Sequence, residues 1–380
     1  MLRDPCISLL RELIAIDSVN PSLVPGATGE GPIAAALAAH LRRLGLDVEV
    51  QDVRPGRPNV VGTLTGRSAG PFLMFCGHLD TVGVEGMAAP FDPVERNGRI
   101  HGRGSQDMKG GVAAMVDAAR VVASEGVDRG RLIVAAVMDE EYESLGADAL
   151  VTRWQADAAV VTEPTDLQIG IAHKGFAWLD VVTHGRAAHG SRPEDGRDAI
   201  LRMGRVLQRL EALDSELQVR PPHPLLGAPS LHASIIRGGT EISSYPARCE
   251  LQVERRTVPG EPAGGVEEEG RTLVERLARE DPEFQAEVRL RFARPAHELA
   301  SDHALPAALR AVLHDMGVGS GPVGMSFWTD AAVLGMAGIP SVLFGPGGAG
   351  LHSPDEYVTT ADVLTCRDAL VRLASRYLRS

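Results

Sequence analysis

Acidic and histidine side chains recur where apolar segments of the 380-residue sequence end. The apolar stretch PFLMFCGH leads into His78 and Asp80, and further acidic or histidine residues stand in GRGSQDMKGG, MDEEYES, TEPTD and GLHSPDEY. The full set is His78, Asp80, Asp107, Glu140, Glu141, Glu163 and His352. Imidazole and carboxylate ligands together suit a metal such as zinc, and a carboxylate shared by two ions allows a two-metal hydrolytic site. The residue types therefore point to a metal site.

The elements around these residues alternate between helix and strand. Residues 32–44 have helical periodicity that stops at Gly45, and buried strands are predicted in NVVGTLTG, PFLMFCGH, RLIVAAVMDEE and AAVVTEP. A helix in GGVAAMVDAARVVASEG separates the second and third of these strands. Such alternation predicts an α/β sheet covered on both faces. Ligand sites in such sheets gather at strand ends, which is where the acidic and histidine residues stand.

The pattern changes from about Gly175 onward. Strands are predicted in GFAWLDVVTHGRAAHG, SLHASIIRGG, RCELQVERRT and QAEVRLRFA, and helices in RDAILRMGRVLQRLEALDSEL and GVEEEGRTLVERLARE. The resulting order, strand-helix-strand-strand-helix-strand, suits a small two-layer α+β (ferredoxin-like) sandwich. We expect one domain formed by residues 1–174 and 294–380, with an inserted domain of residues 175–293.

The combined motifs resemble those of a family of dizinc amidohydrolases and metallopeptidases. This family includes acetylornithine deacetylase, succinyl-diaminopimelate desuccinylase, aminoacylase and glutamate carboxypeptidase, and the resemblance covers nearly the whole chain. It implies a zinc-exopeptidase-like catalytic domain with a mixed sheet and an inserted dimerisation domain, and hence a homodimer. It also implies two Zn²⁺ ions as cofactors, with Co²⁺ or Mn²⁺ as possible substitutes.

The resemblance assigns the metal ligands residue by residue. One metal would be bound by His78, Asp107 and Glu163. The other would be bound by Asp107, Glu141 and His352, so that the Asp107 carboxylate bridges the two ions.

Two further acidic residues match positions beside the metals. Glu140 falls on the family's general base, which removes a proton from the metal-bridging water and later donates it to the departing amine. Asp80 matches a carboxylate that orients His78 and fixes its imidazole tautomer, with Gly77 leaving room. Apart from the family, a chain that turns out of a strand can direct two adjacent glutamates into one cleft with different roles.

Each of these residues taken alone has an ordinary structural explanation. His78 could be a hydrogen-bonded core histidine, and Asp107 could cap a helix that starts near Gly110. Glu140 and Glu141 could be solvated loop carboxylates. None of these explanations accounts for the ordered set. A nucleotide site at GGAGLHSP is a weaker alternative, because the stretch lacks the lysine and following Ser/Thr of a P-loop.

The inserted segment holds a second group of candidate residues. HGRAAHGS resembles the family segment in which a histidine, here His189, reaches the partner subunit's active site and binds the oxyanion of the tetrahedral intermediate. Arg256 stands where the family binds the substrate carboxylate, a task that suits a planar bidentate donor. Ser243 stands where many relatives have a substrate-contacting asparagine, so substrate identity cannot be copied from them. A surface loop and a surface strand are the ordinary explanations for the first two.

Composition restricts the partners and the compartment. A net charge of −12 disfavours nonspecific binding to nucleic acid or to an anionic membrane. The four cysteines lack CxxC spacing, so we expect reduced core residues rather than disulfides. No run of about 18 apolar residues suggests a membrane span. The N-terminal stretch lacks the apolar core and cleavage site of a secretory signal, so we expect a cytoplasmic protein.

The sequence thus predicts a homodimeric dizinc hydrolase that cleaves the amide bond of an N-acyl amino acid, of the deacetylase or desuccinylase type. A carboxypeptidase acting on small peptides or acylated glutamate is the alternative within the same chemistry. Glu163, rather than aspartate, at its ligand position resembles the deacylase and carboxypeptidase side of the family. A catalytically silent metal-binding scaffold is the alternative of another class, and the presence of Glu140 argues against it, since a structural metal needs no base.

Overall fold

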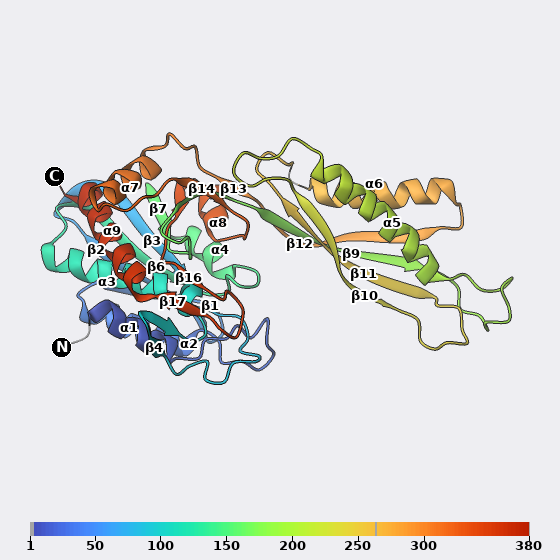
Figure 1. Ribbon diagram of the computed structural model, residues 1–380, viewed down its shortest axis with the longest axis horizontal. Coiled ribbons are helices and arrows are strands. Elements are labelled where there is room, and N and C mark those ends of the chain that lie inside the picture. The colour runs from blue at the N-terminus through green and yellow to red at the C-terminus, as the bar shows by residue number, and fades with distance from the viewer. Residues whose placement is uncertain (1–3, 263, 380) are drawn as a thin grey trace. The chain divides into compact units, whose positions relative to one another are not determined.

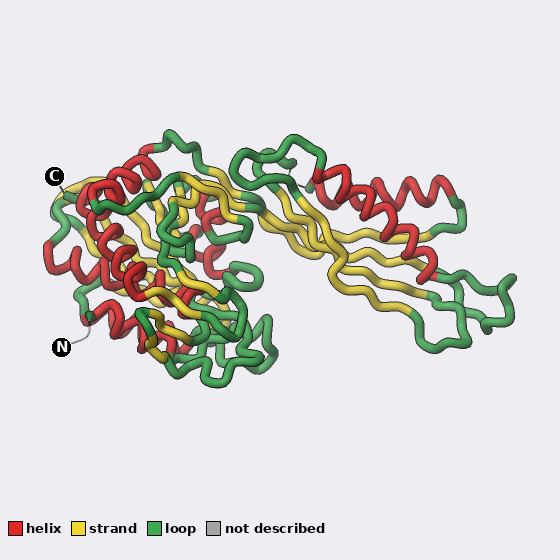
Figure 2. Tube along the Cα trace, in the orientation of Figure 1, coloured by secondary structure: helices red, strands yellow, loops and turns green. Residues whose placement is uncertain are grey.

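A computed structural model describes residues 4–262 and 264–379 and divides the chain into two compact units (Figure 1, Figure 2). The first unit contains the described residues up to Ile171, together with Leu299–Val323 and those from Thr329 onward. The second contains the described residues of Ala172–Glu298 and the segment Gly324–Trp328.

The main sheet is mixed. Its strand order is β1-β2-β6-β3-β7-β15-β8-β13, and β14 pairs with β8. The strands are β1 (Asp47–Arg54), β2 (Arg57–Thr65), β3 (Ser68–His78), β6 (Arg129–Val137), β7 (Ala158–Val161), β8 (Ile169–His173), β13 (His297–Glu298), β14 (Pro322–Met325) and β15 (Ser341–Leu343). The four central strands β6, β3, β7 and β15 run parallel, and the sheet continues antiparallel on both sides. This sheet confirms the predicted α/β fold class.

Helices bury both faces of the parallel strands. The helices of the first unit are α1 (Pro5–Ile14), α2 (Gly31–Arg43), α3 (Gly110–Glu125), α4 (Leu145–Val151), α7 (Ala304–Asp315), α8 (Ala331–Met336) and α9 (Thr360–Leu378). Leu73 and Phe75 of β3 share one apolar core with residues of α1, α2, α3, α7 and α9. The alternate residues Met74 and Cys76 are buried as well, as expected for a strand covered on both sides.

A second, small antiparallel sheet brings two distant loops together. It has the order β16-β17-β5-β4, with β16 (Gly348–Ala349), β17 (Tyr357–Thr359), β5 (Arg99–His101) and β4 (Val94–Arg96). A short helical turn, η1 (Ser105–Lys109), follows β5 and leads directly into α3. Because Tyr357 pairs with His101, the loop between β16 and β17 lies beside the segment that carries η1.

The second unit is an antiparallel sheet with two helices. Its strands β9 (Gly175–His184), β10 (Ser230–Gly238), β11 (Arg248–Thr257) and β12 (Gln285–Arg294) pair in the order β10-β11-β9-β12. Helices α5 (Ala199–Gln218) and α6 (Gly265–Glu280) pack on alternate strand residues such as Leu179, Leu251 and Val288. Asp198 caps α5 by accepting the N–H of Leu201. The order of elements and the strand order confirm the predicted ferredoxin-like topology.

Two expectations from composition can be compared with the structure. Cys6, Cys76, Cys249 and Cys366 are all free and buried, as predicted. Among the described residues, no helix is both long and apolar enough to cross a membrane.

Candidate active site

The parallel strands of the first unit deliver polar residues to one edge of the sheet. β3 ends at His78, which lies in register with Val137, the last residue of β6. β7 ends at Val161, and Glu163 follows two residues later. Because the carboxyl ends of parallel strands meet at the same edge, the residues that follow these strands converge.

Asp107 stands at the centre of this convergence. Its Oδ1 lies 3.0 Å from Nε2 of His78, and its Oδ2 lies 3.3 Å from Nε2 of His352. The same His352 nitrogen lies 3.3 Å from Oε2 of Glu141. Oε2 of Glu140 is 4.0 Å from Nε2 of His78. The two oxygens of Asp107 therefore face two different histidines, which is the geometry expected of a carboxylate between two ions.

The donor set fits metal ions. Among the described residues, His78, Asp107 and Glu141 have donor atoms within 4.8 Å of one another, and so do His78, Glu140 and Glu163. Neither group matches a predicted ligand set. Compared with the predicted set of His78, Asp107 and Glu163, the first group has Glu141 in place of Glu163, and the second has Glu140 in place of Asp107. Oε1 of Glu141 and Oε1 of Glu163 are buried and have no hydrogen-bond partner within the described part of the chain. Unpaired buried carboxylate oxygens are unfavourable unless a cation faces them.

The electrostatics of the site also favour a cation. Burial lowers the pKa of His78, but its hydrogen bond with Asp107 and the nearby carboxylates outweigh burial and raise that pKa well above its usual value. Contacts with Asp107 and Glu141 raise the pKa of His352 to about 10. Burial raises the pKa of Glu140 and of Glu163 well above the usual range. Neighbouring carboxylates add to the rise at all four groups, and divalent cations would neutralise that negative charge.

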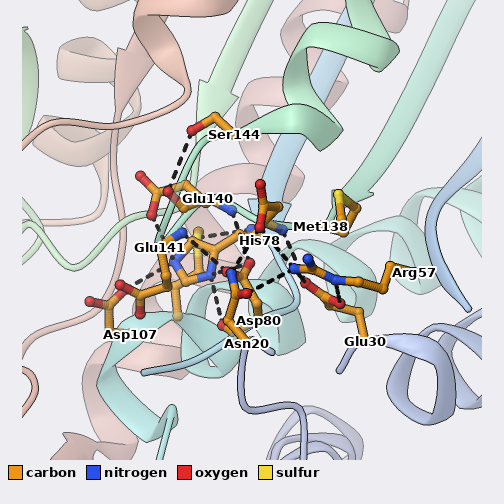
Figure 3. Close-up of polar contacts among 12 residues, drawn as sticks. Asn20, Glu30, Arg57, His78, Asp80, Asp107, Met138, Glu140, Glu141 and Ser144 are labelled. Carbon is orange, nitrogen blue, oxygen red and sulfur yellow. Dashed lines mark hydrogen bonds and ion pairs between the residues drawn. The ribbon is translucent and has the colours of Figure 1, made fainter. Parts of the chain in front are cut away.

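Asp80 contacts both a histidine and the two adjacent glutamates (Figure 3). Its main-chain oxygen lies 3.0 Å from Nδ1 of His78, whereas its carboxylate is 3.6 Å away from that nitrogen. The carboxylate accepts the N–H of Glu140 and the N–H of Glu141, each at 3.1 Å, and the side-chain amide of Asn20 at 2.8 Å. Main chain thus orients the imidazole, and the carboxylate holds the glutamates, a contact that the sequence did not predict.

Gly77 leaves room for packed side chains. A Cβ atom at this position would lie 3.0 Å from Cε of Met108, and 3.1 Å from both Oγ1 of Thr162 and Cγ2 of Val112. The space beside Gly77 is therefore occupied by side chains of η1, of α3 and of the segment after β7.

Glu356 ties the Asp107 loop to the His352 loop, and sequence analysis missed it. Its carboxylate is buried and accepts the main-chain N–H groups of Gly104, Gln106 and Asp107 at 2.9, 2.8 and 3.2 Å. It also accepts Nη1 of Arg103 at 2.6 Å. The only available signal was its place in GLHSPDEY, four residues after His352.

The N-terminal part of the chain supplies a second group that the sequence did not reveal. Asn20, Glu30 and Arg57 lie beside Asp80, and Asn20 donates to its carboxylate (Figure 3). No local pattern marks these residues, because their partners are contributed by distant segments.

In the second unit, the structure brings together two of the three predicted residues. His189 is exposed, forms a bridge with Ser244, and its Nδ1 lies 2.8 Å from Oγ of Ser191. The main-chain oxygen of Ser243 accepts the N–H of Gly190, so Ser243 lies beside the His189 loop.

Arg256 stands near the opposite end of β11 from that loop. Its Nη2 pairs with Glu254 at 2.9 Å, and its guanidinium lies over the Phe176 ring at 5.5 Å. The strand from Arg248 to Arg256 spans about 26 Å at roughly 3.3 Å per residue. Ser243 and Arg256 of one chain therefore do not meet within this unit.

The family match and the sequence relatives identify a metal-dependent hydrolase of amide bonds, and the buried donor set is consistent with it. Residues 74–376 match the family described as Peptidase family M20/M25/M40, and the chain belongs to this family. It is 31% identical to an acetylornithine deacetylase of Myxococcus xanthus over 97% of this chain and 96% of that protein.

Solved structures share the fold at low identity. A tripeptidase from Staphylococcus aureus superposes with a TM-score of 0.82 at 18% identity, covering 99% of this chain and 98% of the other. A Bacillus subtilis protein described as a dinuclear metal binding peptidase of the M20 family gives 0.74 at 18% identity, covering 98% and 97%. The family match and the Myxococcus xanthus relative confirm the family that the motifs resemble.

Proposed function

We propose that the protein hydrolyses the amide bond of an N-acyl amino acid, as a deacetylase or desuccinylase. The observation that carries the proposal is the placement of Asp107 between two histidines, with Glu140 on the same side of His78. Similarity to acetylornithine deacetylase over nearly the whole chain supports the substrate class.

Two Zn²⁺ ions are the proposed cofactors, with Co²⁺ or Mn²⁺ as possible substitutes. His78, Asp107 and Glu163 would hold one ion. Asp107, Glu141 and His352 would hold the other, consistent with the approach of His352 to both carboxylates. When bound, such ions polarise the amide carbonyl and make water a stronger acid near neutral pH.

Glu140 is the proposed general base. Its carboxylate would accept the proton of the attacking water and then donate it to the nitrogen of the departing amine. The hydrogen bond from its main-chain N–H to Asp80 fixes the start of the side chain.

We further propose a homodimer formed through the second unit. β10 is an edge strand of its sheet, and its Ile235 and Ile236 are 44% and 51% exposed. An exposed apolar edge strand is a ready surface for pairing with a second copy. In this arrangement His189 would stabilise the oxyanion in the partner's site, with Ser243 beside it.

Arg256 would bind the substrate carboxylate. Its planar guanidinium offers paired donors, and exchange of Glu254 for a substrate carboxylate would keep its charge paired. The cytoplasmic location stays a prediction from the sequence.

A substrate panel tests the proposal. Metal-free protein would be supplied with zinc, cobalt or manganese and assayed on N-acetyl, N-succinyl and N-formyl amino acids and on short peptides. We expect turnover of at least one acyl amino acid, abolished by a chelator and restored by metal. Preference for peptides would indicate the carboxypeptidase alternative, and no turnover of any compound would contradict the proposed function.

A further inference from the structure

A buried ionic network lies behind the turn that carries Glu140 and Glu141 (Figure 3). The turn starts at Asp139, whose φ of 67° is uncommon for a residue with a side chain. The N–H of Asp139 donates to Oε1 of Glu30 at 3.1 Å. The next two N–H groups donate to Asp80. Two buried carboxylates thus hold three successive amides.

Arg57 is a cation shared by this network. Its Nε and Nη2 donate to the two oxygens of Glu30 at 2.6 and 2.7 Å, and Nη2 also donates to Oδ1 of Asp139 at 2.8 Å. Both carboxylate side chains are fully buried, and the Arg57 side chain is 12% exposed. Removal of the guanidinium would therefore deprive two buried carboxylates of the cation that faces them.

Asn20 connects the arginine to the carboxylate nearest the glutamates. Its Oδ1 accepts from Nη2 of Arg57 at 3.0 Å. Its Nδ2 donates to Asp139 at 3.1 Å and to Oδ2 of Asp80 at 2.8 Å. The network is therefore continuous from Arg57 to the N–H groups of Glu140 and Glu141.

We propose that Arg57 is a positioning residue for hydrolysis, acting through Glu30 and Asp139 on the turn that presents Glu140 and Glu141. The inference rests on the proposed function. Arg57 contacts neither of these two side chains, so it acts only through the turn. Loss of the Arg57 guanidinium would weaken binding of the metal ion at Glu141 and displace the proposed base, Glu140. The ion held by Glu163, which follows β7, would be affected less.

Three arginine variants test this inference. Arg57→Met removes the cation while retaining an unbranched side chain. Arg57→Lys keeps the charge but cannot form the paired bonds of a guanidinium. Arg367→Met is the matched control: Arg367 is 14% exposed and bonds the buried Asp117 at 3.0 Å.

The readouts are kinetics and stepwise Co²⁺ titration of the metal-free protein, followed by visible absorption and calorimetry. Reference titrations of Glu141→Ala and Glu163→Ala identify the two binding steps. For Arg57→Met we expect kcat to fall about 10–100-fold, with KM changed less. The Co²⁺ affinity of the binding step that is lost in Glu141→Ala should fall by a similar factor. Arg57→Lys should recover part of both. Arg367→Met should lower only the unfolding temperature.

The inference is overturned if folded Arg57→Met has wild-type kcat and wild-type Co²⁺ affinity, or if Arg367→Met lowers both equally. Should Arg57→Met fail to fold, Glu30→Gln gives the same test in a weaker form, since it keeps the shape and one acceptor of the carboxylate. Wild-type protein that bound no metal and hydrolysed nothing would instead contradict the proposed function. The ratios of kcat and of Co²⁺ affinity between variant and wild type test the role of Arg57 alone.

Discussion

Replacing Glu356 by glutamine tests how strongly one buried carboxylate holds the Asp107 loop. Oε1 of Glu356 accepts the N–H groups of Gln106 and Asp107, whereas Oε2 accepts those of Gly104 and Arg103. Glutamine has one acceptor oxygen, so its NH₂ group must face one pair of donors. The bond from Arg103 is charge-assisted and only 2.6 Å long. We therefore expect the oxygen to stay with Arg103 and the NH₂ group to face the Asp107 loop.

The magnitude follows from the number of donors that lose their acceptor. Each buried donor left unsatisfied costs about 1–3 kcal/mol, so two donors give about 2–6 kcal/mol. Burial raises the pKa of Glu356, so its ionised form is held at some cost that neutral glutamine avoids. We expect Glu356→Gln to reduce the free energy of unfolding by about 2–3 kcal/mol, and to weaken metal binding through Asp107.

Urea unfolding of the metal-free protein and competition with a chelator measure the two effects. Asp355→Asn is the matched control, because Asp355 is the exposed neighbouring carboxylate and its substitution should change stability by less than about 0.5 kcal/mol. A Glu356→Gln protein that matched Asp355→Asn in both stability and metal affinity would refute this reasoning.

Three further predictions address the base, the partner subunit and the edge strand. Glu140→Gln should retain its metal and lose about two to four powers of ten in kcat, measured alongside metal content; full activity would contradict its role. Glu140→Ala and His189→Ala should each be nearly inactive, yet refolding them together should restore about a quarter of wild-type activity, because half the dimers are mixed and one of their two sites is intact. Unrestored activity in confirmed mixed dimers would mean that His189 is not shared across the interface. Ile236→Lys should shift sedimentation toward monomer, and an unchanged dimer would exclude β10 as the pairing edge.

Most of the fold that the sequence could predict followed from the pattern of apolar residues in the strands. Continuous apolar runs over β3, β6 and β7 identified buried strands, because strands covered on both faces lack polar alternation. Parallel strands share an edge, so His78 and Glu163 could be expected to converge without any knowledge of the loops. The alternation of helices and strands after Gly175 likewise predicted the two-layer topology.

Side chains that act through long-range contacts could not be predicted in this way. Glu356 bonds Gly104, and Arg57 bonds Asp139, across separations of 252 and 82 residues. No periodicity links such positions, because their proximity depends on how the loops close over the sheet edge. The position of Arg256, at the other end of β11 from the Ser243 loop, also needed the strand register.

Metal analysis of Asp107→Ala beside Glu163→Ala tests the central claim most directly, since one substitution removes a shared ligand and the other a ligand of one ion. After purification and removal of loosely bound ions, wild type should retain two ions per chain. Glu163→Ala should keep about one, and Asp107→Ala should keep almost none, because it weakens both sites at once. Two tightly held ions in Asp107→Ala would contradict a bridging carboxylate and, with it, the two-metal site proposed for this hydrolase.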